Sequence, residues 1–371
     1  IADSDRRIAW STFDNYESYF NVVAEHCVAA GISTVNPAWE EVKDQPFAQP
    51  IIHINPGRIL VADESNLPIG KHKGKGKKTI KIVPAGKGKS TPKHLREKGK
   101  TTVTEGGTSD TLVAASNCLG ESLSLRVIYK AVNVNPRWTT GVDEVFINRH
   151  NLPMTAGGRN IHISYSSNRK GGMTPIEFKK WIEEDILPHC PIISPDYQYV
   201  FLLDGDDSHA IDFCNMEWMA KLEFIVIFPP PNITHDLQVH DDGEGTFHTF
   251  KNFHWPQAKA DRKLWLKRAG VSRPLDRTDI PDILAVSVPK SFSRHINMTA
   301  TERVGLAPFT RKPLFASHIL STRGSRLAEA CKEHVNGKKI LFLLESEGLE
   351  QASNELLSML GGNKFSSGKM W

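Results

Sequence analysis

The middle of this chain alternates short apolar runs with amphipathic segments, and the order of these runs limits the fold more than any other feature does. Runs of this length that end in turn residues are typical of buried strands, and they occur at residues 58–65, 111–120, 123–132, 197–204 and 223–231. Gly120 and Glu121 join the second and third runs as a hairpin, whereas helical patterns separate the later runs. We therefore expect an α/β fold whose sheet contains both parallel and antiparallel pairs.

Residues 173–187 (MTPIEFKKWIEEDIL) show the clearest start of a helix. Thr174 is placed as the N-cap, Pro175 takes the first helical position, and Glu177 follows three residues after the cap. This spacing is that of a capping box, which satisfies backbone N–H groups that the first turn leaves unpaired. Trp181 lies on the apolar side of the predicted helix, so we expect it in the core.

Further helices are expected towards both ends of the chain. Residues 12–30 carry an apolar helical stripe that stops at Gly31. From Thr246 onward the sequence is mainly helical, with a polar, proline-containing break near residues 273–291. The central α/β region is thus expected to have additional N- and C-terminal helical segments.

Composition argues against several classes of protein. No apolar run reaches the length of about 18 residues that a membrane-spanning helix needs, so no membrane partner is expected. The five cysteines are dispersed and form no CxxC pair, which argues against a disulfide framework or a structural zinc site. Buried thiols in a reducing, intracellular compartment are the simplest interpretation.

Positive charge is concentrated in residues 71–100, which hold eleven Lys and one Arg but a single Glu. The rest of the chain carries more acidic than basic residues. A solvated loop is one interpretation of this segment. The other is DNA binding, because lysines that neutralise phosphates give affinity that does not depend on sequence. The uneven charge favours DNA, and the lysines assigned to it are Lys73, Lys75, Lys77, Lys78, Lys81, Lys87 and Lys89.

Acidic residues follow two of the predicted strands. Asp63 ends the first apolar run and Asp204 ends the fourth; alone, an aspartate before a glycine is ordinary turn chemistry. The carboxyl ends of neighbouring parallel strands lie together, so these two carboxylates would repel each other unless a cation lies between them. A third cluster, Asp241, Asp242 and Glu244, follows the last strand and can return to the same edge. Oxygen ligands without a cysteine favour Mg²⁺ or Mn²⁺ over zinc.

Three histidines lie near the third acidic cluster: His235, His240 and His248. A zinc cluster is one interpretation of them, but scattered surface histidines are expected, because no pair has a helical i, i+4 spacing with an open partner.

Several stretches resemble, in the same order, the sequence blocks of pogo-type DDE/D transposases of the mariner superfamily. The family's second block runs LLLDGHxSH, and its third runs PPxxTHxLQPLD followed by a Phe and a Lys. Residues 202–209 read LLDGDDSH and residues 228–251 read FPPPNITHDLQVHDDGEGTFHTFK. Residues 59–65 (ILVADES) resemble the first block, and the hairpin and helix between the blocks have counterparts at residues 104–131 and 171–188.

This resemblance implies a ribonuclease H-like fold, with a mixed sheet flanked by helices, and makes Asp63, Asp204 and Asp241 the catalytic residues. These would hold two divalent metal ions, Mg²⁺ or Mn²⁺, which activate water or a DNA 3′-hydroxyl to attack phosphorus. The implied protein is a transposase that cuts DNA and joins 3′-hydroxyl ends to target DNA. It would act in the nucleus as a homodimer or larger assembly on transposon ends and target DNA. The residues expected to support the metal ligands are Glu64, His209, His235 and Gln238.

Three regions are then expected along the chain. Residues 1–50 form an N-terminal helical segment and residues 51–265 the DDE/D catalytic domain, with the Lys-rich segment inserted at residues 71–100. Residues 266–371 form a mainly helical C-terminal region.

The sequence departs from the family's blocks in two places. Asp206 stands where the second block has a histidine, which adds charge beside Asp204. The third block reads LQVHDD, so Asp242 competes with Asp241 as the third ligand, although the count from the LQ pair favours Asp241. These departures leave open a domesticated transposase that keeps the fold and binds DNA with weak or no catalysis. A host nuclease on the same fold is the other alternative.

Overall fold

The structure is a computed structural model, and it describes residues 11–43, 48–69, 110–140, 143–150, 161–204, 213–230, 234–241, 245–315 and 319. The chain separates into two compact units. The smaller comprises Ile1–Tyr19, Ile82–Thr101 and Leu314–Trp371, and the larger comprises Phe20–Lys81 and Thr102–Pro313. The larger unit contains the whole of the central sheet. The Lys-rich segment at residues 71–100, with the lysines assigned to DNA, lies outside the described residues.

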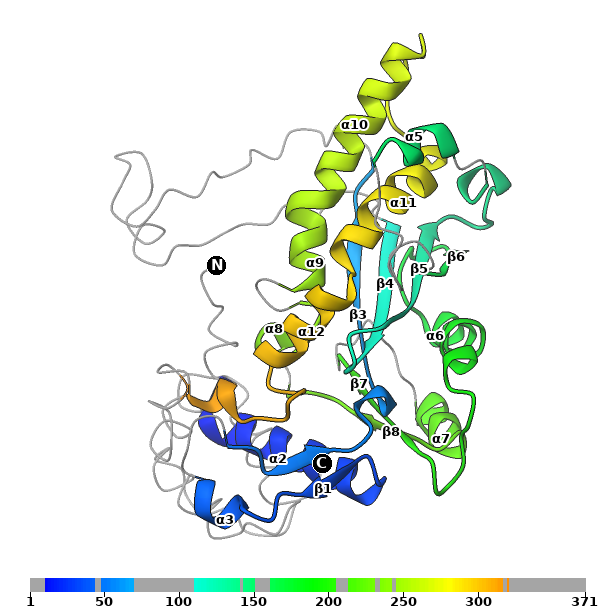
Figure 1. The fold of residues 1–371 in the computed structure, drawn as a ribbon. Coiled ribbons are helices and arrows are strands. Elements are labelled where there is room, and N and C mark those ends of the chain that lie inside the picture. The colour runs from blue at the N-terminus through cyan, green and yellow to red at the C-terminus, as the bar shows by residue number, and fades with distance from the viewer. Residues whose placement is uncertain are drawn as a thin grey trace, which may run out of the picture. The chain divides into compact units, whose positions relative to one another are not determined.

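The core of the larger unit is a six-stranded mixed sheet with the order β6-β5-β4-β3-β7-β8 (Figure 1). Its strands are β3 (Ile59–Leu67), β4 (Asp110–Asn117), β5 (Ser122–Lys130), β6 (Ile163–Asn168), β7 (Tyr199–Leu203) and β8 (Phe224–Ile227). β4 is antiparallel to both β3 and β5, whereas the pairs β5–β6, β3–β7 and β7–β8 are parallel. This is the ribonuclease H-like arrangement, and the predicted fold is confirmed.

A separate two-stranded sheet, β1 (Ser33–Val35) and β2 (Ile51–His53), follows helix α2 (Phe13–Ala29). The other α-helices of the described residues are α3 (Trp39–Val42), α5 (Glu144–Asn148), α6 (Pro175–Trp181), α7 (Phe213–Lys221), α8 (Thr234–Leu237), α9 (Thr246–Thr249), α10 (Trp255–Arg268), α11 (Ile280–Ser291) and α12 (Arg294–Arg303). None of the described helices is long and apolar enough to cross a membrane. Three of the cysteines are buried free thiols, as expected: Cys27, Cys118 and Cys190.

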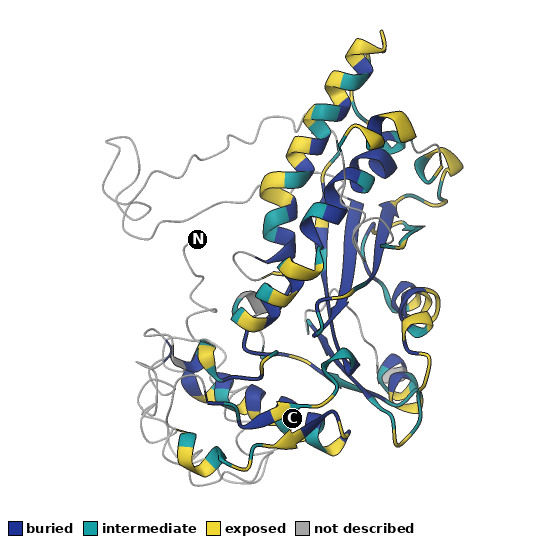
Figure 2. Ribbon diagram, viewed as in Figure 1, coloured by how far each residue is buried: buried dark blue, intermediate teal, exposed yellow. Residues whose placement is uncertain are grey.

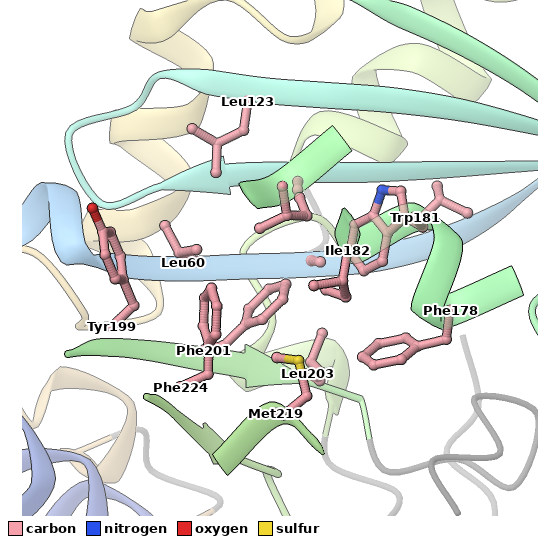
Figure 3. Packing of buried hydrophobic residues seen from close by; sticks show 14 of the residues in the cluster. Leu60, Leu123, Phe178, Trp181, Ile182, Tyr199, Phe201, Leu203, Met219 and Phe224 are labelled. Carbon is pink, nitrogen blue, oxygen red and sulfur yellow. The ribbon is translucent and has the colours of Figure 1, made fainter. Parts of the chain in front are cut away.

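Helices cover both faces of the large sheet. On one face, α6 and α7 pack against side chains such as Ala62 and Phe201 (Figure 3); we call this the α6–α7 face. On the other, α5, α10 and α11 pack against side chains such as Leu112 and Ala114; we call this the α10–α11 face. Side chains alternate along each strand, so Val113 lies on the α6–α7 face between these two. The strands are accordingly buried, whereas exposed residues lie on the outer sides of the helices (Figure 2).

The helix predicted at residues 173–187 begins as expected. The Thr174 hydroxyl accepts a hydrogen bond from the backbone N–H of Glu177 (3.2 Å), which confirms the predicted cap. Trp181 is 1% exposed and packs against Phe201 in the core of the α6–α7 face (Figure 3). This helix therefore covers the sheet at β7, the strand that leads to Asp204.

One expectation about the C-terminal half is wrong. The break predicted near residues 273–291 ends earlier, because α11 (Ile280–Ser291) is a buried helix in the cluster of the α10–α11 face. Its apolar residues surround the helix rather than forming one stripe, and Pro281 sits in the first turn, where its missing N–H costs nothing. α10 (Trp255–Arg268) crosses residue 265 and packs in the same cluster as α11.

Candidate active site at the carboxyl edge of the sheet

Asp63 and Asp204 lie next to each other at the point where the parallel pairing of β3 and β7 ends. Ala62 opposite Leu203 is the last pair in the register of β3 and β7. Asp63 directly follows Ala62, and Asp204 directly follows Leu203. Neighbouring strands lie about 4.8 Å apart. Along β3, Asp63 alternates with Ala62 and has the same orientation as Leu67, which packs on the α10–α11 face. The register of one strand pair therefore makes the two aspartates neighbours.

Asp241 lines the same open cavity as Asp63 and Asp204. It lies in the turn between α8 and α9, after the last strand of the sheet. The cavity measures about 290 Å³ and is lined by Asp63, Glu64, Ser65, Asn66, Thr111, Asp204, Gln238, Asp241 and Lys251. Asp63 is buried, Asp204 is half-buried and Asp241 is exposed, so the three carboxylates run from the core to solvent.

The cavity also contains hydrogen-bond donors. The Asp63 carboxylate accepts a hydrogen bond from the backbone N–H of Glu64 (2.7 Å). The side-chain amide nitrogen of Gln238 is buried, and within the described part of the chain it has no hydrogen-bond partner. A buried donor without a partner is costly, so this amide is suited to a group that enters the cavity. Lys251 is exposed, with its ammonium 5.3 Å from the centre of the Phe247 ring.

His240, directly before Asp241, is almost completely buried at 1% exposure. Its Nδ1 is hydrogen-bonded to the Thr246 hydroxyl (2.7 Å) and its Nε2 to the Ser116 hydroxyl (3.3 Å). The ring also lies beside the backbone carbonyl of Val61. Burial lowers the pKa of His240 to about 4, so the ring is neutral at physiological pH.

The oxygen atoms that line the cavity suit a hard divalent cation. The side chains that line it offer carboxylate and amide oxygens but no thiol and no imidazole, which favours Mg²⁺ or Mn²⁺. Among the described residues, no three His, Cys, Asp or Glu side chains are gathered closely enough to hold a metal ion. The three aspartates share a cavity without forming a closed ligand cluster. That Asp63, Asp204 and Asp241 hold the metal remains a prediction.

Residues 110–264 match the family model described as DDE superfamily endonuclease. Over this part of its length the chain is similar to DDE superfamily endonucleases. The resemblance to DDE-type enzymes expected from the sequence blocks is therefore confirmed at the level of this superfamily. The match includes Asp204 and Asp241, whereas Asp63 precedes it and is placed next to them by the β3–β7 register.

Among solved structures, the chain is similar to one of a pre-cleavage Mos1 transpososome, with 10% sequence identity and a TM-score of 0.36. The similarity covers 86% of this chain and 63% of that one, so this chain spans less than two thirds of the Mos1 chain. Among curated proteins, none matches the sequence significantly.

The structure brings several of the predicted site residues to this cavity: Asp63, Glu64, Asp204, Gln238 and Asp241. Glu64 also lines a smaller cavity on the α6–α7 face, beside Phe178 and Trp181. His209 and Asp242 lie outside the described residues, as does the side chain of His235 in α8. The roles assigned to all of them remain predictions.

The sequence did not assign Lys251 to the site, and the expectation that His240 lies at the surface is wrong, because its side chain is 1% exposed. Lys251 is the last residue of the stretch that resembles the family's third block, and this position is the signal that could have identified it. His240 has no comparable signal, because a single histidine before an aspartate does not indicate that its ring is buried against the sheet.

Proposed function

We propose that the protein is a metal-dependent DNA transposase, which cuts phosphodiester bonds and joins the 3′-hydroxyl ends to target DNA. The observation that carries the proposal is the convergence of Asp63, Asp204 and Asp241 on one polar cavity, each from a different segment of the chain. Divalent ions held there would activate the attacking oxygen and stabilise the leaving oxygen. The similarity to DDE superfamily endonucleases supports this chemistry.

Lys251 and Gln238 are suited to hold the phosphate group that reacts. Both line the cavity of the three aspartates, and both offer N–H donors. Donors of this kind bind the non-bridging oxygens of a phosphodiester and orient the phosphorus for in-line attack. The exposed position of Lys251 at the mouth of the cavity would allow a DNA strand to enter there.

Helix α10 offers a surface for the DNA that flanks the reacting phosphate. Lys263 and Lys267 are exposed on this helix, and Lys251 lines the cavity just before the helix begins. Lys263 and Lys267 are one helical turn apart, about 6 Å along the axis, so they point in the same direction. Within residues 245–275 the only acidic residue is Asp261, which is half-buried. The phosphate backbone can therefore follow α10 away from the cavity.

The residues just before the Lys-rich segment support a DNA-binding surface that this segment shares with α10. The segment connects β3 to β4, whose last registered pair is Leu67 with Asp110. The backbone carbonyl of Pro68 accepts hydrogen bonds from Trp255 Nε1 (3.1 Å) and Lys259 Nζ (2.9 Å), both on α10. The chain is thus held against α10 where the segment begins. We propose that the lysines of residues 71–100 and those of α10 bind the same DNA.

A plasmid-nicking assay tests the proposal and its alternatives. We expect supercoiled plasmid to be nicked in Mg²⁺ or Mn²⁺ and to stay intact in EDTA. Joining of a labelled oligonucleotide with a free 3′-hydroxyl to the plasmid would separate a transposase from a host nuclease. Tight DNA binding without cleavage in either metal would instead favour a domesticated, inactive transposase.

We also propose that the protein works in the nucleus as a homodimer or larger assembly on DNA. Excision of a DNA segment requires cuts at both of its ends, which two copies of the active site would provide. Light scattering of the protein with and without a DNA duplex measures the assembly, and imaging of the tagged protein in cells tests the location.

A further inference from the structure

Asp241 is held differently from the other two aspartates. Asp63 lies within β3 and Asp204 directly follows β7, whereas Asp241 lies in the turn between α8 and α9. Functional groups in a site must keep their positions to within about 0.5 Å, and groups on loops need support from their surroundings to do so. Some other contact must therefore fix the turn that carries Asp241.

His240, whose side chain is buried, is hydrogen-bonded to residues at the other end of this turn. Its ring bonds to the Thr246 hydroxyl (2.7 Å), and its backbone carbonyl accepts a hydrogen bond from the N–H of Phe247 (3.0 Å). Thr246 is fully buried, and the ring of Phe247 packs with its centre 5.7 Å from that of His240. The residues at the start and at the end of the turn are thus joined through one buried side chain.

The same ring attaches the turn to the sheet. His240 is hydrogen-bonded to the Ser116 hydroxyl (3.3 Å), and its ring lies beside the backbone carbonyl of Val61. Val61 and Ser116 are direct partners in the β3–β4 ladder, so the hydrogen bond to Ser116 places the ring next to Val61 on β3. Asp63 follows Val61 by two residues, which is about 6.6 Å along a strand. His240 therefore connects the strand of Asp63 to the turn of Asp241 by a short, buried path.

We propose that His240 is a positioning residue that fixes Asp241 relative to Asp63, and thereby sets the geometry in which these carboxylates bind a divalent metal. The inference rests on the proposed function, since it requires that the aspartates bind metal. The sequence block that this chain resembles has a leucine where His240 stands, so this hydrogen-bonded device is a property of this chain rather than of the block.

Mn²⁺ affinity, measured by electron paramagnetic resonance, tests this role without relying on activity. His240→Leu keeps an apolar side chain of similar bulk but removes the hydrogen bonds of the ring. His53 is a matched control, because it bonds to the Ser33 hydroxyl (2.7 Å) and the Leu306 carbonyl (2.6 Å) and does not line the cavity. We expect His240→Leu to weaken Mn²⁺ binding about 10-fold or more, the range for residues that orient metal ligands, and His53→Leu to leave it unchanged.

Two milder variants keep the test decisive if His240→Leu does not fold. Thr246→Val removes one hydroxyl at nearly constant shape, and it should weaken Mn²⁺ binding alone but add nothing in the His240→Leu background. His240→Gln keeps a donor and an acceptor and should restore part of the affinity. Equal Mn²⁺ affinity in the wild type, His240→Gln and Thr246→Val would overturn the positioning role. A wild-type protein that binds no Mn²⁺ would instead contradict the proposed function, and the inference with it.

Discussion

Asp63 and Asp204 become neighbours through the register of a single parallel strand pair, in which Ala62 and Leu203 are the last partners before them. Their proximity does not depend on the conformation of a long loop. The strands beneath them are buried between two layers of helices, which keeps the pair rigid. Asp241 joins them from a turn that His240 hydrogen-bonds to Ser116 on β4, the ladder partner of Val61 on β3. The candidate site therefore combines a pair fixed by the sheet with a third carboxylate fixed by a buried side chain.

Replacement of both Lys263 and Lys267 by glutamate should weaken DNA binding and leave Mn²⁺ affinity unchanged. Each lysine that contacts a phosphate adds about 0.9 to the slope of log K against log salt concentration, so the slope should fall by about 2 in magnitude. Fluorescence anisotropy of a labelled duplex, titrated at several salt concentrations, measures both the affinity and the slope.

The control for this variant changes the same charge on the opposite side of the sheet. Lys179 and Lys180 are exposed on α6, which packs on the α6–α7 face. Their joint replacement by glutamate should leave the salt slope close to that of the wild type. An equal loss in both double variants would show a general effect of net charge and would contradict α10 as the DNA surface.

Arg126 should be essential for stability, because it neutralises carboxylates that are buried beside it. Its guanidinium contacts Glu177 (3.1 Å) and Asp185 (2.7 Å), and all three side chains are buried. Arg126→Met would leave two buried carboxylates without their cation, so the free energy of unfolding should fall by about 3–5 kcal/mol. Urea denaturation measures this change.

Neutralising the same carboxylates should restore much of that stability. Adding Glu177→Gln and Asp185→Asn to Arg126→Met removes the unpaired charges. A loss in Arg126→Met of no more than about 1 kcal/mol, as for an exposed ion pair, would contradict a structural role for this cluster.

His53 should make the folded state less stable in acid. Burial lowers the pKa of His53 below its ordinary value of 6.5, which the unfolded chain retains. As the pH falls through 6.5, His53 becomes protonated in the unfolded state but stays neutral in the folded state. The free energy of unfolding therefore decreases. The free energy of unfolding of the wild type should therefore decrease relative to that of His53→Leu as the pH is lowered. Chemical denaturation of both proteins at several pH values tests this, and a difference independent of pH would contradict it.

The strands that hold the site could be predicted because they are buried on both faces. β3 and β7 lie between two helical layers, so their apolar runs are nearly continuous and stand out in the sequence. β6 (Ile163–Asn168) was missed, because this edge strand reads ISYSSN and is only half-buried. Its structure depends on pairing with β5, which local pattern does not reveal.

The candidate site was predictable only in part for a related reason. Asp63 and Asp204 are marked by the strands that they follow, and adjacent parallel strands must end at the same edge. The approach of Asp241 and Lys251 depends on how the chain from α8 to α10 packs on the sheet. The hydrogen bonds of His240 to Ser116 and Thr246 arise from that packing, so no local spacing encodes them.

The central claim is that the aspartates of this cavity carry out metal-dependent cleavage of DNA. Asp204→Asn keeps the shape of the side chain and removes its charge, so the fold and the DNA surface on α10 should be preserved. The most direct measurement is the rate of plasmid nicking by this variant and by the wild type in Mn²⁺, with DNA affinity measured in parallel. We predict that nicking falls by more than about 100-fold, beyond the range for residues that only orient ligands, while DNA affinity is retained. Nicking by Asp204→Asn at the wild-type rate would contradict the account.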